Sequence, residues 1–362
     1  MSVSCARLLG LTPLFVLGLA ACGAPEPEPV PAPAPALTEA AAPMGALSRQ
    51  GIEQAVFTAP PATTPAPAPA SGVAAAPPPP VVADPALIRA QILLDRARFS
   101  PGVIDGLGGD NTRQAIAALE KAAGLTEDGV LDAEVFARLT GADARTVLTD
   151  HVITTEDLAG PFIGAVPADL EAMSKLQTVG YANIRESLAE RFHMTEAMLT
   201  ALNPGVDFTR AGQSIVVPAV AADALPADVA RITVDKAERS VRAFDAAGTL
   251  LAFYPATIGS SERPAPSGTV TVKGVAPAPN YTYDPSRVSY DRGSKRLVVP
   301  QGPNNPVGSV WIDLSRDTYG IHGTPDPSRV GKTFSSGCVR LTNWDAEQLA
   351  AHVKPGVEVV FL

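Results

Sequence analysis

The chain is poor in cysteine, histidine and tryptophan. Its 362 residues contain three cysteines, four histidines and two tryptophans. None of the spacings that hold a metal ion, such as HExxH, connects the histidines, and the cysteines are too few for a zinc site. The sequence therefore predicts no metal centre. The histidines are His151, His193, His322 and His352.

Basic runs are also scarce, and the formal net charge is −9. From Val229 to the end the chain has 15 Lys+Arg and 12 Asp+Glu, a net charge of +3, so the remainder carries −12. No basic run is interleaved with aromatic residues, which argues against a nucleic-acid partner. A charge of +3 would suit an anionic polymer but is weak evidence by itself.

The apolar run from Leu8 to Ala21 is too short to span a bilayer comfortably, and small residues follow it. We interpret residues 1–21 as a secretory signal peptide. A buried helix is the alternative. The proline-rich sequence that follows argues against it, because that sequence gives such a helix nothing to pack against.

The residues LAAC, from Leu19 to Cys22, resemble the bacterial lipobox. By that resemblance Cys22 becomes the first residue of the exported protein and carries several acyl chains that anchor it in a membrane. Gly23 in the next position favours the outer membrane of a Gram-negative cell. A plain signal peptide, cut near the same place, is the alternative. Cys338 is then a lone thiol, either an inert core residue or a reactive one.

Residues 22–84 are predicted to be a disordered linker rich in proline and alanine. The segment from Gly23 to Ala86 holds 17 of the 36 prolines. This composition cannot bury a core and favours extended polyproline segments. Such a spacer would let a lipid-anchored protein reach away from its membrane.

Residues 85–140 contain three helical patches with apolar faces. Asp105-Gly106 and Asp128-Gly129 make turns 23 residues apart. Together with a G-x-x-T sequence and an apolar helix between them, they resemble the small three-helix peptidoglycan-binding domain. Leu119-Glu120 stand where that family usually has Phe-Gln. A helical spacer that binds nothing is the alternative.

Residues 141–179 show little periodicity and are predicted to be a connector. Residues 180–220 are similar to a LysM module, a strand–helix–helix–strand unit that packs on N-acetylglucosamine chains. The similarity lies in apolar positions such as Leu188 and Leu199 and in a short strand from Ser214 to Val217. The usual G-D-[ST] opening is missing. A degenerate module that only packs against its neighbours is therefore the alternative.

Residues 229–362 change to a pattern of strands and turns. A hairpin turn is expected at Ala247-Gly248. One clear helix is expected near the end, opening at Thr342 with Asp345 three residues later. The sequence VEVVFL is predicted to form a closing strand. The domain is therefore predicted to be mostly β.

The stretch IHGTPDPSRVGKTFSSGCVRL places His322 and Cys338 sixteen residues apart, each beside a glycine. We expect residues 317–321 to form a strand that delivers His322. The helix after Cys338 would favour its thiolate. A thiol, a histidine that takes its proton and backbone amides for the oxyanion fit acyl transfer. A satisfied core histidine and a buried cysteine would explain the spacing equally well.

The order HGT, then SSGC-V-R-L, closely resembles the signature of the YkuD-type L,D-transpeptidases, and the resemblance extends over residues 229–362. It implies that Cys338 is the nucleophile and His322 its base. The backbone carbonyl of Gly323 would orient the imidazole, as a third triad member does in other enzymes.

The resemblance also implies an oxyanion and substrate-binding set. The amides of Gly337 and Cys338 would form the oxyanion hole, next to Ser335 and Ser336. Many family members have histidine at the position of Ser336. Arg340 matches the family arginine, which holds either the site or a substrate carboxylate; a structural ion pair is the alternative.

The predicted fold is multidomain: a C-terminal, mostly-β, YkuD-like catalytic domain, preceded by a small three-helix peptidoglycan-binding-like domain and an α+β LysM-like module. The implied reaction cleaves the meso-diaminopimelate–D-Ala bond of tetrapeptide stems and passes the acyl group to an amine, with no metal or organic cofactor. The implied partners are peptidoglycan stem peptides, glycan and a membrane. We expect a periplasmic monomer. A non-catalytic wall-binding scaffold and an L,D-carboxypeptidase that uses water are the alternatives.

Two further predictions concern the site. Cys338 is expected to be unusually acidic because of His322 and the helix that follows. The sequence before Val229 is expected to localise the enzyme without forming its active site, because every proposed catalytic residue lies beyond Gly320.

Overall fold

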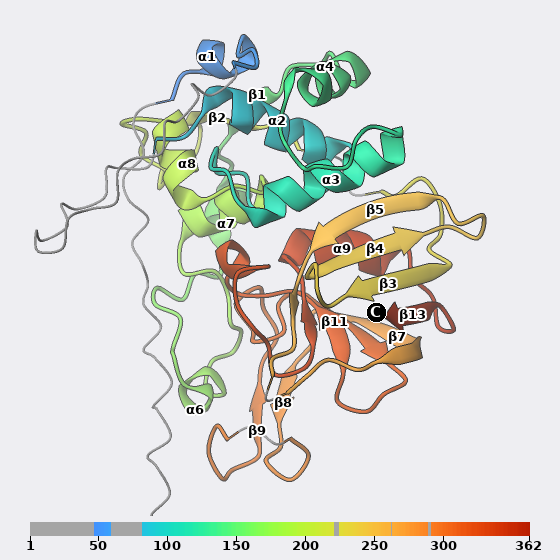
Figure 1. The fold of residues 1–362 in the computed structure, drawn as a ribbon. Coiled ribbons are helices and arrows are strands. Elements are labelled where there is room, and N and C mark those ends of the chain that lie inside the picture. The colour runs from blue at the N-terminus through green and yellow to red at the C-terminus, as the bar shows by residue number, and fades with distance from the viewer. Residues whose placement is uncertain (1–46, 59–81, 221–223, 262, 289–290) are drawn as a thin grey trace, which may run out of the picture. The chain divides into compact units, whose positions relative to one another are not determined.

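The structure is a computed structural model, and it describes residues 47–58, 82–220, 224–261, 263–288 and 291–362. The predicted signal peptide, Cys22 and most of the predicted linker lie outside these residues. Within the described residues, no helix is long and apolar enough to cross a membrane. The predicted helical N-terminal domain and mostly-β C-terminal domain are both confirmed (Figure 1).

Three helices form the predicted small domain: α2 (Pro85–Arg96), α3 (Asp110–Ala123) and α4 (Ala133–Ala142). Asp84 caps α2 by accepting a hydrogen bond from the backbone of Ala86, and Asp132 caps α4 in the same manner. Gly124, in the left-handed region with φ +70, ends α3. Local sequence signals therefore set the boundaries of these helices.

Two buried side chains hold the two Asp-Gly turns of this domain. Gln91 Oε1 accepts both backbone N–H groups of Asp105-Gly106, at 3.1 and 2.8 Å. Glu120 Oε2 accepts both N–H groups of Asp128-Gly129, at 2.9 and 2.8 Å. Glu120 thus supplies the oxygen that the turn requires, although the family usually has glutamine there.

Residues 141–179, which are predicted to be a connector, contain regular secondary structure. This segment holds β1 (Leu148–Val152), α5 (Thr155–Ala159) and α6 (Leu170–Met173). The predicted LysM-like segment holds α7 (Ile184–Arg191), α8 (Glu196–Leu202) and β2 (Ser214–Pro218). β1 and β2 pair antiparallel along their whole length. The first strand of the LysM-like unit therefore lies in the predicted connector, where the sequence has too little periodicity to predict it.

One hydrophobic core runs through the three-helix domain and the unit built from β1, α7, α8 and β2. Helix α1 (Arg49–Glu53) joins this core, and its Ile52 is fully buried. The carboxylate of Glu53 accepts hydrogen bonds from the backbone of Val147 and Leu148. The prediction of a linker without a core is therefore wrong for residues 47–58, whose composition lacks the proline repeats of the flanking sequence.

The C-terminal domain is built on one nine-stranded sheet in the order β5-β4-β3-β13-β7-β10-β11-β12-β6. β13 pairs parallel with β3, and β12 pairs parallel with β11; the other pairs are antiparallel. The strands are β3 (Arg231–Asp235), β4 (Ser240–Phe244), β5 (Leu250–Pro255), β6 (Thr257–Ile258), β7 (Gly268–Pro277), β10 (Val310–Leu314), β11 (Gly320–His322), β12 (Val339–Arg340) and β13 (Glu358–Phe361).

Two local predictions for this domain are confirmed. Gly248, with φ +84, lies in the predicted hairpin between β4 and β5. Helix α9 (Asn343–Ala351) begins after Thr342, whose hydroxyl accepts the N–H of Asp345 at 3.1 Å. The strand expected at residues 317–321 is shorter and later, because residues 315–319 form the turn between β10 and β11.

A separate hairpin of β8 (Tyr281–Tyr283) and β9 (Leu297–Val299) extends away from the large sheet (Figure 1). Its buried side chains share a small core with Leu170 and Val179 of the segment predicted to be a connector. The backbone of Val179 also donates to the carbonyl of Gln301 at 2.9 Å. The N-terminal half of the chain therefore supports this hairpin.

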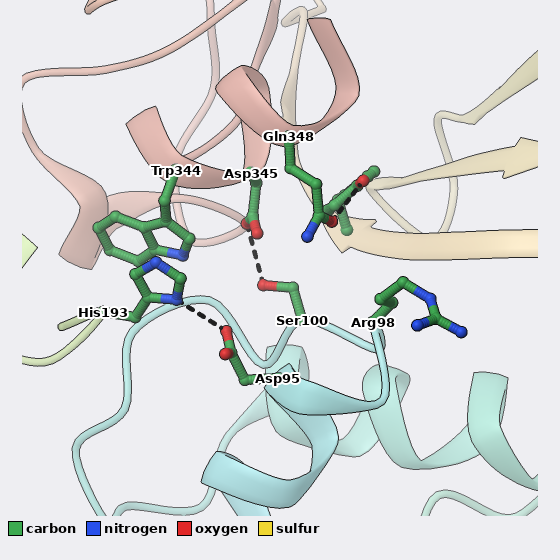
Figure 2. A pocket seen from close by; sticks show the side chains of 8 residues that line it. Asp95, Arg98, Ser100, His193, Trp344, Asp345 and Gln348 are labelled. Atoms are coloured by element: carbon green, nitrogen blue, oxygen red, sulfur yellow. Dashed lines mark hydrogen bonds and ion pairs between the residues drawn. The ribbon is translucent and has the colours of Figure 1, made fainter. Parts of the chain in front are cut away.

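A buried polar cluster joins α9 to the helical modules that precede Val229 (Figure 2). The ring of His193 stacks on Trp344, with centroids 4.9 Å apart, and its Nδ1 lies 3.0 Å from Asp95. Ser100 donates to the carboxylate of Asp345 at 2.9 Å. These contacts bind the helix that follows the predicted nucleophile to the helical modules.

We predict that Glu120→Ala lowers the free energy of unfolding by about 1–3 kcal/mol, because it leaves two turn amides without their acceptor. Glu120→Gln keeps an acceptor oxygen and should lose much less. Urea unfolding of the whole chain measures both, with Glu134→Ala, on the exposed side of α4, as the control. An unfolding midpoint of Glu120→Ala equal to that of the wild type would contradict this role.

Candidate active site

A cavity of about 480 Å³ opens between the β8–β9 hairpin and the end of β11. The residues that line it lie between Arg263 and Arg340 and include His322, Ser336 and Cys338. The expectation that the cavity wall comes from the sequence after Val229 therefore holds. No group of His, Cys, Asp or Glu side chains in the described part of the chain could hold a metal ion.

His322 is the last residue of β11 and only 3 % exposed. Its Nδ1 lies 2.6 Å from the carbonyl oxygen of Gly323. Because a carbonyl only accepts, Nδ1 must carry the proton, which leaves Nε2 with a lone pair. The expected orienting contact of Gly323 is thus present, and the ring is prepared to accept a proton.

Trp311 stacks on one face of the His322 ring. It lies opposite His322 in the β10–β11 register, and the two rings stack with centroids 5.4 Å apart. Gly320 makes room for the indole, because a Cβ at that position would lie 2.4 Å from Trp311. No local pattern singles out Trp311, since only the strand pairing shows that it lies opposite His322.

Cys338 immediately precedes β12, which pairs parallel with β11. This pairing brings the cysteine and the histidine, distant in sequence, to the wall of one cavity. Cys338 is a free, half-buried thiol, and its Sγ lies 3.7 Å from the carbonyl oxygen of Thr318. The two residues thus line one cavity, and acyl transfer requires a thiol and a base in one site.

The prediction of an acidic Cys338 is wrong in direction. Burial raises the pKa of the Cys338 thiol, and this effect outweighs the Gly320 amide and the charges of Arg340 and Arg263. Burial, followed by the charge of Arg340, lowers the pKa of His322 to about 3. At neutral pH the pair is therefore a thiol beside a neutral imidazole.

The helix contributes less than expected because it begins at Asn343, with β12 between it and Cys338. The favourable field of a helix N-terminus falls off within about one turn. The local sequence showed a helix nearby but not the strand that separates it from the thiol.

Ser335 holds the backbone around the nucleophile. Its Oγ accepts the amides of Gly259 at 2.7 Å and Gly337 at 3.2 Å, and donates to the carbonyl of Cys338 at 2.5 Å. The Gly337 amide therefore does not point into the site as the predicted oxyanion donor. Glycine is needed at position 337 for its backbone conformation, because its φ is +108 and a Cβ would lie 2.9 Å from Tyr319.

Ser336 and Arg340 line the cavity as predicted. Arg340 lies close enough to both reacting side chains for its charge to lower the pKa of His322 and to oppose the rise at Cys338. It shares the cavity with Arg263, and aspartates line the same cavity, so both signs of charge are present. The two arginines suit a substrate with carboxylates.

Asn343 is a second residue that sequence analysis missed. Its Oδ1 accepts the backbone amides of Ser309 and Thr324, each at 3.1 Å. The Thr324 amide belongs to the turn that also presents the Gly323 carbonyl to His322. The only local signal was its position after the Thr342 cap, which predicts a helix start but no role in the site.

Two family models match this chain. The model described as "L,D-transpeptidase catalytic domain" matches residues 229–361, and the model described as "Putative peptidoglycan binding domain" matches residues 83–139. Both matches confirm the family resemblances inferred from the motifs. They do not test the lipobox or the LysM-like module, which stay predictions.

Curated relatives agree with the first match. The chain is 33 % identical over 177 residues to the "Putative L,D-transpeptidase YkuD" of Bacillus licheniformis, covering 48 % of this chain and 90 % of the relative. It is 34 % identical over 181 residues to the "Probable L,D-transpeptidase ErfK/SrfK" of Salmonella typhimurium, covering 48 % of this chain and 58 % of the relative. The chain thus spans somewhat over half of this second relative.

Solved structures give a partial similarity. L,D-transpeptidase 3 from Mycobacterium tuberculosis is 15 % identical, with a TM-score of 0.32, and the match covers 42 % of this chain and 75 % of that chain. The family assignment rests on the family model and on the curated relatives.

We predict that alkylation of Cys338 in the folded protein has its pH midpoint above the ordinary thiol value, because burial raises its pKa. In His322→Ala the midpoint should not rise further, since the ring is already neutral above pH 3. Acylation by substrate should nevertheless fall about 10²–10⁴-fold when the general base is removed.

The measurement is the rate of iodoacetamide labelling against pH, with the denatured protein as the reference. A wild-type midpoint below the ordinary value that rises in His322→Ala would establish a thiolate–imidazolium pair instead.

Proposed function

This chain belongs to the YkuD-type L,D-transpeptidase family, and on that premise we propose that Cys338 forms a thioester with peptidoglycan stem peptides. The observation that supports this most is that Cys338 shares its cavity with His322, whose tautomer is fixed by the Gly323 carbonyl. In that tautomer Nε2 carries a lone pair that accepts a proton. The family mechanism uses a cysteine nucleophile, and Cys338 is the cysteine in the matching segment.

The reaction begins from the neutral pair. Sγ of Cys338 attacks the carbonyl carbon between meso-diaminopimelate and D-Ala while Nε2 of His322 takes the thiol proton. The amide C–N bond then breaks, and the same proton moves from His322 to the nitrogen of the leaving D-Ala. The product is a thioester and free D-Ala, and the histidine is neutral again.

The second half-reaction repeats these steps in reverse order. An acceptor amine attacks the thioester carbonyl, His322 takes a proton from the amine, and the proton returns to Sγ as the thiol leaves. A side-chain amine of another diaminopimelate gives a cross-link, whereas water gives hydrolysis. The Cys338 amide is the proposed oxyanion donor, because the Gly337 amide is bonded to Ser335.

A neutral resting pair has a consequence for reactivity. A thiol of raised pKa is a poor target for unrelated electrophiles, but its thiolate, once formed beside a substrate, is strongly nucleophilic. Arg340 and Arg263 would hold carboxylates of the stem peptide in the cavity that both arginines line. Ser336 would contact the same bound substrate.

The setting of the reaction is also proposed. The peptidoglycan-binding model match supports contact with the cell wall, to which the LysM-like unit would add glycan contacts. A periplasmic monomer, anchored to the outer membrane by acyl chains on Cys22, would reach the wall through its proline-rich spacer. Cross-linking or remodelling the wall there would influence cell shape.

We predict that purified disaccharide tetrapeptide adds one acyl group to the wild-type chain and releases D-Ala, whereas Cys338→Ala does neither. Intact-protein mass spectrometry measures the adduct, and the products show whether an amine or water resolves it. Ser328→Ala, an exposed loop variant, is the matched control. A folded wild-type chain that forms no adduct would refute the proposal and favour a wall-binding scaffold.

We predict that the exported protein partitions into detergent and that its N-terminal mass corresponds to acylated Cys22. Cys22→Ser should abolish both properties, because serine has no thiol to alkylate. Finding the wild-type protein in the soluble fraction with an unmodified Cys22 would show that the lipobox resemblance is misleading.

A further inference from the structure

We propose that Glu190, in α7 of the LysM-like unit, is a positioning residue for His322 and acts through Asn343. This inference rests on the proposed function of His322 as the base. It assigns a part of the catalytic arrangement to the LysM-like unit, which the sequence placed outside the active site.

Asn343 is the point where three catalytic-domain segments meet. Its Oδ1 accepts the amides of Ser309 and Thr324, each at 3.1 Å, and its Nδ2 donates to the carbonyl of Pro303 at 3.2 Å. Thr324 follows Gly323, whose carbonyl fixes the His322 tautomer at 2.6 Å. A shift of the Asn343 side chain would therefore shift the turn that orients the base.

The packing around Asn343 leaves little freedom. A Cβ at Gly308 would lie 2.2 Å from its Oδ1, and a Cβ at Gly323 would lie 2.1 Å from the same atom. Two glycine backbones thus enclose the amide oxygen. The Asn343 side chain therefore has one position, and its orientation depends on the groups that bind its Nδ2.

Glu190 holds that end from α7, in the LysM-like unit. Its Oε2 accepts from Asn343 Nδ2 at 2.9 Å, across 153 positions of sequence. Glu190 is 7 % exposed, and its other oxygen has no hydrogen-bond partner among the described residues. A carboxyl group buried against an asparagine is costly, which argues that it serves more than packing.

The surroundings of Glu190 favour its neutral form. Burial first, then the charges of Glu186 on its own helix and Glu347 on α9, raise the pKa of Glu190 to about 8, although the Asn343 hydrogen bond opposes them. Tyr181 is the other titratable group that it faces. At neutral pH the group is therefore an uncharged carboxylic acid that fits a buried amide.

The sign of the pH effect follows from this raised pKa. The folded state holds the Glu190 proton more tightly than the unfolded state, so its contribution is complete below the ordinary glutamate value. That contribution is lost as pH rises to about 8. Above that pH, ionised Glu190 weakens the arrangement around Asn343, whereas glutamine at this position cannot ionise.

The test uses the whole chain with purified disaccharide tetrapeptide and follows D-Ala release. Glu190→Ala should lower the maximal acylation rate by about 10- to 100-fold with little change in KM, because a misplaced base slows chemistry more than binding. Glu190→Gln should restore most of the rate at pH 7. Glu196→Gln, on α8 of the same unit and in a 3.8 Å ion pair with Arg185, is the control and should match the wild type.

The pH dependence separates positioning from simple stabilisation. The ratio of the Glu190→Gln rate to the wild-type rate should rise as pH passes about 8. A folded Glu190→Ala with the wild-type maximal rate, or a change confined to KM, would overturn the proposal. If Glu190→Ala does not fold, a Glu190→Gln ratio that is flat with pH would overturn it. Failure of the wild-type chain to release D-Ala would refute the proposed function instead.

Discussion

The site depends on one hydrogen bond, from Nδ1 of a buried His322 to the carbonyl of Gly323. Burial makes the imidazolium costly, and the carbonyl fixes which nitrogen keeps the proton. Nε2 then carries the lone pair of a ring that lines the same cavity as Cys338. Trp311 on one side and the Asn343-bound turn on the other keep the ring in that orientation. The remaining features of the domain serve to hold this arrangement or to admit substrate to it.

This constraint changes the account of how the cysteine is activated. A resting thiolate would need a charged partner in a buried place, and the structure instead holds two neutral groups. The proton must then move during attack, so the base is required at the chemical step rather than before it. The N-terminal half contributes to this step without lining the cavity. It reaches the catalytic domain through Glu190, which accepts from Asn343, and through Ser100, which donates to Asp345 of α9. It also reaches that domain through Asn111, which donates to the carbonyl of Val330 at 2.9 Å.

The features that depend on residues adjacent in the sequence were predictable. The helical patches of the three-helix domain and the Thr342 cap are local, and each led to a correct element. The HGT and SSGC sequences are also local, and their His322 and Cys338 line one cavity. The β1–β2 pair, the Trp311 stack and the Glu190–Asn343 bond join distant segments, so no local pattern could show them. The direction of the Cys338 pKa was wrong for the same reason, because burial is a property of the assembled domain. Likewise, only the folded loop shows that Ser335 takes the Gly337 amide.

The central claim is that the base rests as a neutral imidazole with its proton on Nδ1. Nitrogen NMR of isotopically labelled His322 in the free enzyme tests it most directly. The account predicts one protonated and one bare ring nitrogen throughout the neutral range, with titration only near pH 3. A doubly protonated ring at neutral pH, losing its proton together with the Cys338 thiol, would contradict it.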